Sequence, residues 1–181
     1  MQKALFILGQ LNDDDVEWLI EQGARHKYEE GARLIEQGKP NEYVFVLLTG
    51  HVSISIAGIG EVAVEGSGEV LGEMSLVDSR LPSATVTALE ECYVLRLSHE
   101  TLRRHVHDEH GFGMRFYRAL ATFLSERLRS SQAQLDFDEE TPLDPHREQK
   151  GELDMNVLDN IHVAGARFDR LLKQMMSARS T

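Results

Sequence analysis

The residues best suited to binding chemistry lie in one short stretch, residues 71–86, which reads LGEMSLVDSRLPSATV. Gly72 and Glu73 precede residues that can form a short helical turn, and the small residues Ser83 and Ala84 open a strand. Proteins hold a phosphate with backbone N–H groups at a helix start, with hydroxyls and with a bidentate guanidinium. The stretch therefore contains most parts of a phosphate-binding loop, and we call it the cassette.

The arginine nearest to the small-residue pair does not stand directly beside it. Pro82 precedes the small-residue pair, and proline fixes its own φ and has no backbone donor. Arg80 lies two residues earlier, and two extended residues cover about 6 to 7 Å, so its side chain must fold back to reach the loop. A hydrogen bond to a charged group contributes about 1.5 to 3 kcal/mol, so losing it weakens phosphate binding about tenfold to a few hundredfold.

Composition limits the classes of function. The chain has 181 residues, 41% of them hydrophobic, which is enough for one core with an appendage. A formal net charge of -11 repels nucleic acid, so we expect no DNA binding. The single cysteine, Cys92, forms neither an internal disulfide nor a cysteine-ligated cluster. We find no membrane span and no convincing signal peptide, and we expect a soluble, cytoplasmic protein.

The apolar pattern changes along the chain from helix to strand. Asn12 and the three acids after it form an N-cap, and apolar residues then follow at helical spacing as far as Gly23. Residues 24–98 show brief alternating runs punctuated by glycines, including a tight hairpin at residues 57–61. Several short strands joined by glycine turns predict a barrel or sandwich.

The ordered set of these signals resembles the cyclic nucleotide-binding domain family, the sensor module of catabolite activator proteins. The segment YEEGARLIEQGKPNEYVFVLLTGHVSI resembles the opening strands, SGEVLGEMSL the approach to the cassette and ATVTALEECYVLRLS the closing strands. The resemblance runs from about Leu5 to about Leu135. It implies a mainly β protein with flanking helices: an eight-stranded, jelly-roll-like β-roll followed by a long C-terminal dimerisation helix.

The resemblance also implies roles for the cassette residues. Gly72 would permit close backbone approach, Glu73 would accept a hydrogen bond from the ribose 2′-hydroxyl, and Ser83 and Ala84 would face the phosphate. The family usually has an arginine where Pro82 stands, so any binding of cyclic AMP or cyclic GMP should be weak unless Arg80 substitutes. The alternative for Glu73 and Arg80 is a surface ion pair with each other.

Two helical runs follow the predicted roll. One begins at Ser98 and extends to about His107, and the other extends from Met114 to Leu135, after the glycines at 111 and 113. Its broad apolar face comprises Phe116, Tyr117, Leu120, Phe123, Leu124 and Leu128. In relatives this helix pairs two subunits, so the resemblance implies a homodimer; the alternative is packing against its own roll.

We divide the chain into residues 1–135, the domain with its long helix; residues 136–151, an acidic linker; and residues 152–177, an amphipathic helix. The last helix carries an apolar stripe at spacings of 4, 3, 4, 3 and 4 residues: Val157, Ile161, Ala164, Phe168, Leu171 and Met175. Residues 136–181 contain ten acids and six Lys or Arg, giving -4, which is unfavourable for a DNA-recognition helix. The stripe could dock on its own roll or long helix, or capture another protein.

Catalytic and metal-binding patterns are weak. His105 and His107 point in different directions on a helix, only His107 and His110 share a face, and we interpret these histidines as solvated. We assign no catalytic or metal-binding residue. We predict a non-enzymatic regulatory module with a degenerate cassette, which acts through protein contacts. The alternatives are a working cyclic nucleotide sensor, and a cupin-like enzyme, for which the strand block supplies only His26 and His51 as histidines.

Overall fold

The computed structural model describes residues 3–78, 80–137 and 155–177. The strands are β1 (Ala24–Tyr28), β2 (Arg33–Ile35), β3 (Tyr43–Thr49), β4 (Val52–Ile56), β5 (Gly60–Glu65), β6 (Val70–Leu71), β7 (Thr85–Ala88) and β8 (Cys92–Ser98). The helices are α1 (Lys3–Gln10), α2 (Asp13–Gln22), α3 (Glu73–Asp78), α4 (His99–Asp108), α5 (His110–Phe137) and α6 (Met155–Ser177). Among the helices described, none is long and apolar enough to cross a membrane.

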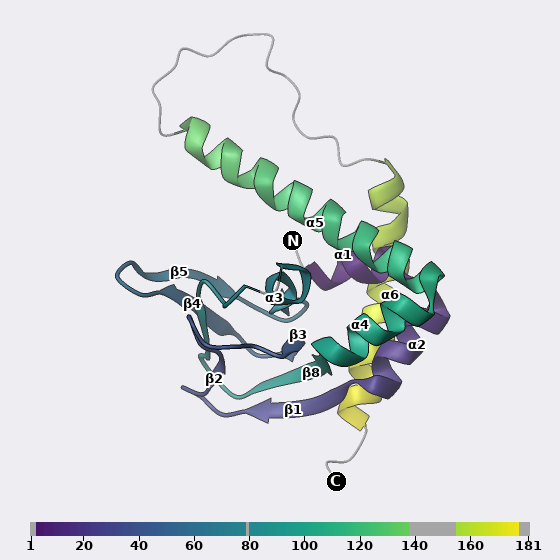
Figure 1. The fold of residues 1–181 in the computed structure, drawn as a ribbon, viewed down its shortest axis with the longest axis horizontal. Coiled ribbons are helices and arrows are strands. Elements are labelled where there is room, and N and C mark those ends of the chain that lie inside the picture. Colours follow the sequence, from purple (N-terminus) through teal and green to yellow (C-terminus); the bar gives the residue numbers. More distant parts are fainter. Residues whose placement is uncertain (1–2, 79, 138–154, 178–181) are drawn as a thin grey trace.

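The strands form two four-stranded antiparallel sheets, ordered β1-β8-β3-β6 and β2-β7-β4-β5. Helices lie beside the strand region, with α4, α2 and α6 on one side of it (Figure 1), and α3 contacts β3. The predicted hairpin joins β4 to β5, and its two glycines adopt positive φ, 82° at Gly58 and 102° at Gly60. The predicted β-roll with flanking helices is confirmed.

The first sheet is buried on both faces because β3 and β8 alternate between two cores. One core lies between the sheets and contains Phe45, Leu47 and Val94. The other lies between the first sheet and the helices and contains Leu48 and Leu95. This second core fixes the helices against the roll.

The first helices combine a confirmed prediction with an element that the sequence analysis did not predict. Helix α2 begins as predicted, and Asn12 and Asp15 form a reciprocal capping box. Helix α1 was not predicted, although its side chains Ala4, Ile7 and Leu8 are buried in the helical core. Its amide at Ala4 also donates to the carbonyl of Gly68, at 2.8 Å, which ties α1 to the approach to β6.

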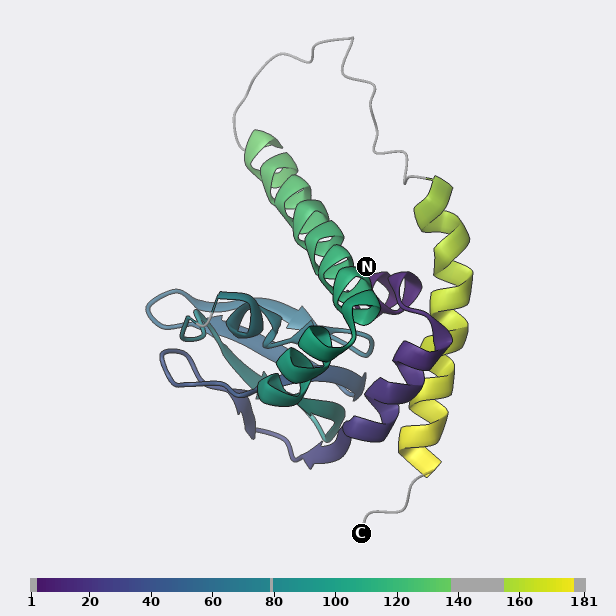
Figure 2. The same ribbon diagram turned by 45° about the vertical axis from the view of Figure 1, so that its right-hand side comes forward.

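The predicted start of the long helix is wrong. Helix α5 begins at His110 rather than Met114, so Gly111 and Gly113 lie inside it. A Cβ at Gly113 would lie 2.9 Å from the carbonyl oxygen of Val106 in α4. Glycine therefore allows the first turn of α5 to pass close to the end of α4, and α5 then extends away from the roll (Figures 1 and 2).

Helix α6 docks on its own molecule, along α1 and α2 (Figure 2). Of the two alternatives left open by the sequence, cis docking is observed, mainly on α1 and α2 and with a further contact from β1 of the roll. Buried side chains of α6 join the helical core: Ala164, Phe168, Leu171 and Met175. The side chains of Val157 and Ile161, which belong to the predicted stripe, lie outside the described set. Residues 138–154, which cover most of the predicted linker and the start of the predicted helix, also lie outside it.

Arginines hold both ends of this contact. Arg167 donates to the carbonyl oxygens of Leu8 and Leu11 at 2.9 and 2.6 Å, so it satisfies the end of α1. Arg25 of β1 donates to the carbonyl oxygens of Met175 and Met176 at 3.1 and 3.2 Å, near the end of α6. The described part of the α6 stripe, from Ala164 to Met175, is therefore occupied within the chain.

Candidate functional site

An open pocket of about 230 Å³ lies between α3, the loop after it and strands of both sheets. Its lining brings together all five predicted site residues: Gly72, Glu73, Arg80, Ser83 and Ala84. Apolar side chains from the roll form its floor: Ile35, Ile54, Leu71 and Val86. A polar loop facing an apolar floor is the usual composition of a small-molecule site.

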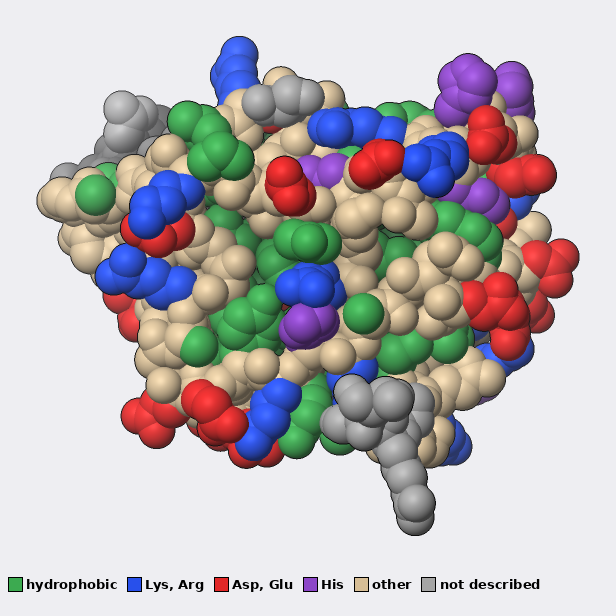
Figure 3. Space-filling model, turned by 60° about the horizontal axis from the view of Figure 1, so that its bottom comes forward, with side chains coloured by type: hydrophobic (Ala, Val, Ile, Leu, Met, Phe, Trp, Pro, Cys, Tyr) green, Lys and Arg blue, Asp and Glu red, His purple; other side chains and the backbone are tan. Residues whose placement is uncertain are grey.

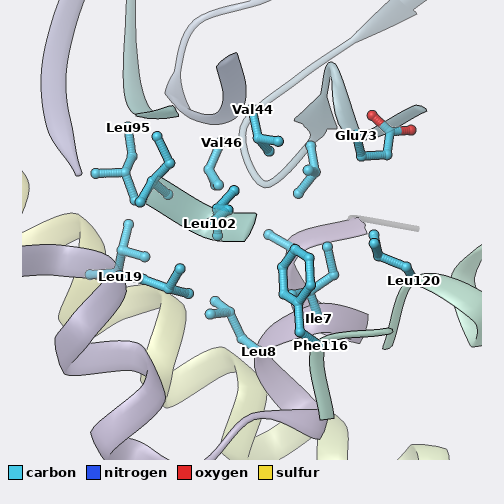
Figure 4. Close-up of a pocket in the computed structure, with 14 residues that line it drawn as sticks. Ile7, Leu8, Leu19, Val44, Val46, Glu73, Leu95, Leu102, Phe116 and Leu120 are labelled. Carbon is cyan, nitrogen blue, oxygen red and sulfur yellow. The ribbon is translucent and has the colours of Figure 1, made fainter. Parts of the chain in front are cut away.

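Glu73 is the first residue of α3, and only 5% of its surface is exposed. It also borders an apolar cavity of about 30 Å³ between the roll and the helices, where Ile7, Phe116 and Leu120 are its neighbours in the lining. Figure 4 shows its carboxylate pointing away from these apolar side chains. No hydrogen bond or ion pair to this carboxylate occurs within the described residues, so its oxygens can accept from a ligand in the pocket.

Gly72 has a φ of 83°, a conformation that favours glycine. A Cβ there would lie 2.5 Å from the carbonyl oxygen of Tyr43 and 2.6 Å from Nδ2 of Asn41. Asn41 Nδ2 itself donates to the Tyr43 carbonyl at 2.7 Å. Gly72 therefore permits the cassette to approach β3, and Asn41, which the sequence analysis missed, braces that contact.

Arg80 does not pair with Glu73, so the alternative of a surface ion pair between these two residues is wrong. The side chain of Arg80 is 86% exposed, and its Nε lies 3.6 Å from Oδ2 of Asp78. The backbone N–H of Arg80 also donates to Oδ1 of Asp78 at 3.0 Å. Within the pocket lining the carboxylates of Glu73 and Asp78 thus face one arginine, a balance unfavourable for an anion.

Pro82 forms part of the pocket wall and anchors the loop through its backbone. Its carbonyl accepts from the N–H of Gly38 at 3.0 Å. Three residues later, the hydroxyl of Thr85 accepts from the N–H of Gln37 at 3.1 Å. These bonds hold the loop against the turn between β2 and β3, and an arginine at position 82 could keep the same carbonyl bond.

Arg103 of α4 is a further residue that the sequence analysis missed. Its Nη2 donates to the carbonyl oxygens of Ser75 and Leu76 at 3.4 and 3.2 Å. It thereby joins α4 to the short helix of the cassette. No local pattern signals this contact, because the partners lie 27 and 28 residues apart.

The interpretation of the three histidines as solvated is wrong for His105. Its ring stacks on Trp18 with centroids 3.7 Å apart and planes 5° apart, and burial lowers its pKa. His107 is exposed beside Asp108, and His110 is exposed at the start of α5. Within the described residues no three His, Cys, Asp or Glu side chains are grouped to hold a metal ion.

The histidines of the strand block do not meet at a common site. His51 Nδ1 lies 2.6 Å from Oε1 of Glu90 at the surface, and His26 lies on β1. The part of the chain that the structure describes therefore offers no multi-histidine centre for a cupin-like reaction.

Comparison with known proteins places this geometry in a family. The family model described as cyclic nucleotide-binding domain matches residues 25–109. Glutaminase 2 of Bradyrhizobium diazoefficiens is 29% identical over 132 residues, which is 72% of this chain and 21% of that protein. Cyclic AMP receptor protein of Thermus thermophilus is 28% identical over 134 residues, which is 70% of this chain and 58% of that protein.

Solved structures share the fold. A cyclic nucleotide-binding domain from Methylobacillus flagellatus matches with a TM-score of 0.66 at 23% identity, covering 78% of this chain and 85% of that one. The chain spans only 21% and 58% of the two curated relatives above, so the matched region is the domain and not the whole protein.

Proposed function

Because this chain belongs to the cyclic nucleotide-binding domain family, with residues 25–109 forming that domain, we propose that it is a non-enzymatic regulatory module whose cassette binds cyclic nucleotides weakly. In this proposal the module acts through protein contacts. Its pocket keeps the carboxylate and the small-residue loop suited to a cyclic nucleotide, but lacks a guanidinium held in place for the phosphate.

One observation supports weak binding above the others. Pro82 occupies the pocket wall at the position where the family usually has an arginine, while Arg80 extends into solvent beside Asp78. Recruiting Arg80 would require breaking its contact with Asp78 and ordering an exposed, flexible side chain, which costs about 1 to 2 kcal/mol in rotamer entropy alone. A fixed guanidinium avoids this cost.

Isothermal titration calorimetry with cyclic AMP and cyclic GMP tests the proposal. We expect no micromolar binding by the wild-type protein, and a gain of about tenfold to a few hundredfold for Pro82→Arg. Pro82→Gln is the matched control, because it removes the proline without adding a charge. Micromolar affinity of the wild-type protein for either nucleotide would contradict the proposal.

A working cyclic nucleotide sensor is the second candidate, favoured by the acceptor that Glu73 offers inside the pocket. It requires Arg80 or the backbone amides to hold the phosphate. In that case the wild-type protein binds with micromolar affinity, and Arg80→Gln removes at least tenfold of it if the guanidinium is responsible.

We propose that the protein contact is a homodimer through α5. The side chains of Met114, Tyr117, Leu124 and Leu128 are 76%, 44%, 38% and 61% exposed. With the exposed Ala121 they are spaced by 3, 4, 3 and 4 residues, the seam of a two-stranded coiled coil. A second copy of the same seam is the occupant that fits, since symmetric pairs are the commonest oligomers.

The mass in solution tests the dimer. Light scattering coupled to gel filtration should give twice the chain mass, and Leu124→Glu should give the monomer. Leu89→Glu is the control, because Leu89 is 42% exposed and lies on the turn between β7 and β8. A monomeric wild-type protein at tens of micromolar contradicts the dimer but leaves the cassette proposal standing.

A further inference from the structure

A second and larger hollow, of about 420 Å³, lies where residues 40–43 meet the start of α4 and the loop after α3. We call it the α4 groove, and its lining residues are Pro40, Asn41, Glu42, Tyr43, Ser75, Arg80, Leu81, Ser98, His99, Glu100 and Arg103. Gly72, Glu73, Ser83 and Ala84 line the cassette pocket and not this groove. Its volume falls in the range of about 300 to 1,000 Å³ typical of small-molecule sites.

Arginines gather at the α4 groove, whose lining holds two of them and two carboxylates on a strongly acidic chain. Besides Arg80 and Arg103, Arg96 lies next to it, with its guanidinium carbon 4.4 Å from the centroid of the Tyr43 ring. The carboxylates in the lining are Glu42 and Glu100, and Glu100 Oε1 already accepts from Arg104 at 2.7 Å. On the face shown in Figure 3, acidic and basic side chains are interspersed around a centre where a basic side chain and a histidine lie among hydrophobic groups.

His99 supplies an independent sign that a polar partner belongs in the groove. The residue is 5% exposed, and its Nε2 has no hydrogen-bond partner within the described residues. Burial, with the positive charge of Arg103 adding to it, lowers the pKa of His99, whereas the backbone groups of Gly72 and Tyr43 beside the ring and the charge of Glu42 oppose this shift. A buried polar atom without a partner is uncommon in native proteins, and one explanation is a ligand that completes its bonding.

The start of α4 adds to the attraction for an anion. His99 is the first residue of this ten-residue helix, and Ser98 caps it by accepting from the N–H of Thr101 at 3.0 Å. The N-terminus of a helix carries a partial positive charge that favours negative groups. Tyr43 offers an aromatic face on the other side of the hollow.

We propose that the α4 groove binds a small organic oxyanion, a phosphate monoester or a carboxylate, between His99, Arg103 and the start of α4. The body of the ligand lies against Tyr43. This site adjoins the cassette pocket, with which it shares Ser75, Arg80 and Leu81, but its ligand is not the cyclic nucleotide.

Titration of the full chain at constant ionic strength, followed by amide NMR, tests the site. Inorganic phosphate and citrate are the probes, because they distinguish a phosphate ligand from a carboxylate ligand, and chloride is the control for salt. We expect saturable shifts at Tyr43, His99 and Glu100 with one of the probes, and an upward shift of the His99 ring pKa. The amides of Ser83 and Ala84 should move little.

Matched variants decide whether the binding is specific. Arg103→Gln should weaken binding of the anion about tenfold or more. Arg118→Gln should not, because it removes the same charge from an exposed position of α5, a helix that contributes no residue to the groove. Arg96→Gln, which leaves the Arg103 contacts to α3 intact, should weaken binding several-fold and so separates anion binding from a disturbed cassette.

Three outcomes would overturn the proposal. They are no saturation by either probe up to tens of millimolar, equal weakening by Arg103→Gln and Arg118→Gln, and shifts centred on Ser83 and Ala84 rather than on Tyr43 and His99. None of them bears on the affinity of the cassette for cyclic nucleotides.

Discussion

Arg115 of α5 holds Asp15 of α2 through two parallel hydrogen bonds, from Nε to Oδ2 at 2.6 Å and from Nη2 to Oδ1 at 2.8 Å. Asp15 also accepts from the backbone N–H of Asn12, at 2.8 Å, and is 5% exposed. Burial by itself raises the pKa of Asp15, but the bonds from Arg115 and Asn12 outweigh it and lower the pKa. One carboxylate thus closes the capping box of α2 and fixes the long helix to it.

Asp15→Asn should destabilise the protein by about 1 to 3 kcal/mol at pH 7, because the buried carboxylate loses charged hydrogen bonds. Since the folded pKa is lowered, the stabilisation is present above the ordinary pKa near about 4 and is lost as pH falls through the lower folded value. Urea denaturation at pH 7 and at pH 3 measures both effects. The exposed Asp14→Asn is the control, and an equal acid sensitivity of wild type and Asp15→Asn would contradict the assignment.

Gly72→Ala should cost more than Gly58→Ala. Both glycines have a positive φ, 83° and 82°, so both variants carry the strain of about 1 kcal/mol that alanine meets there. Only at Gly72 would the new Cβ also meet a backbone oxygen, that of Tyr43, at 2.5 Å; at Gly58 it would meet nothing within 4 Å. Denaturant midpoints should rank wild type, Gly58→Ala and Gly72→Ala in falling order, and equal midpoints for the two variants would show that the loop shifts freely.

Trp18, the single tryptophan, should report the protonation of His105. Burial lowers the pKa of His105 while nearby acids oppose it, so the folded state prefers the neutral ring and stability falls as pH drops below about 6.5. The emission of Trp18 should change in the same range, since a charge then forms in a ring stacked 3.7 Å away. His105→Gln should remove this transition and His107→Gln should keep it; a transition retained by His105→Gln would assign it to another group.

Leu171→Ala should loosen α6 from α1 and α2. Leu171 is 1% exposed, and truncating a buried leucine costs about 2 to 5 kcal/mol. Met176→Ala, at a side chain that is 38% exposed near the same end of the helix, should cost well under half as much. Thermal unfolding and limited proteolysis measure the difference, and full protection of α6 in Leu171→Ala would show that its arginine contacts suffice.

Local patterns predicted much of this fold because their signals act over a few residues. Asn12 and Asp15 are three positions apart and form the capping box directly. The glycines of the β4–β5 hairpin likewise adopt the conformation that the turn requires. Helix α1 was missed because it is short, and its apolar side chains gain their stability from long-range packing.

The sequence predicts which residues make up the cassette, but it does not predict their contacts. The five residues share one pocket, as expected from their order along the chain. Whether Arg80 forms an ion pair with Glu73 or with Asp78 depends on burial. Glu73 lies in the interior at the start of α3, whereas the side chain of Arg80 lies in solvent beside Asp78. The role of Asn41 and Arg103 required knowing which distant backbone carbonyls reach the loop.

The sequence by itself determined the β-roll, the place of the cassette and the substitution at Pro82, because these depend on local backbone preferences and on the order of motifs. Only the tertiary structure decided where α6 docks, how Asp15 meets Arg115 and that basic side chains surround the α4 groove. These relationships join residues up to 159 positions apart. Apolar burial and hydrogen-bond satisfaction select such contacts only once the chain has folded.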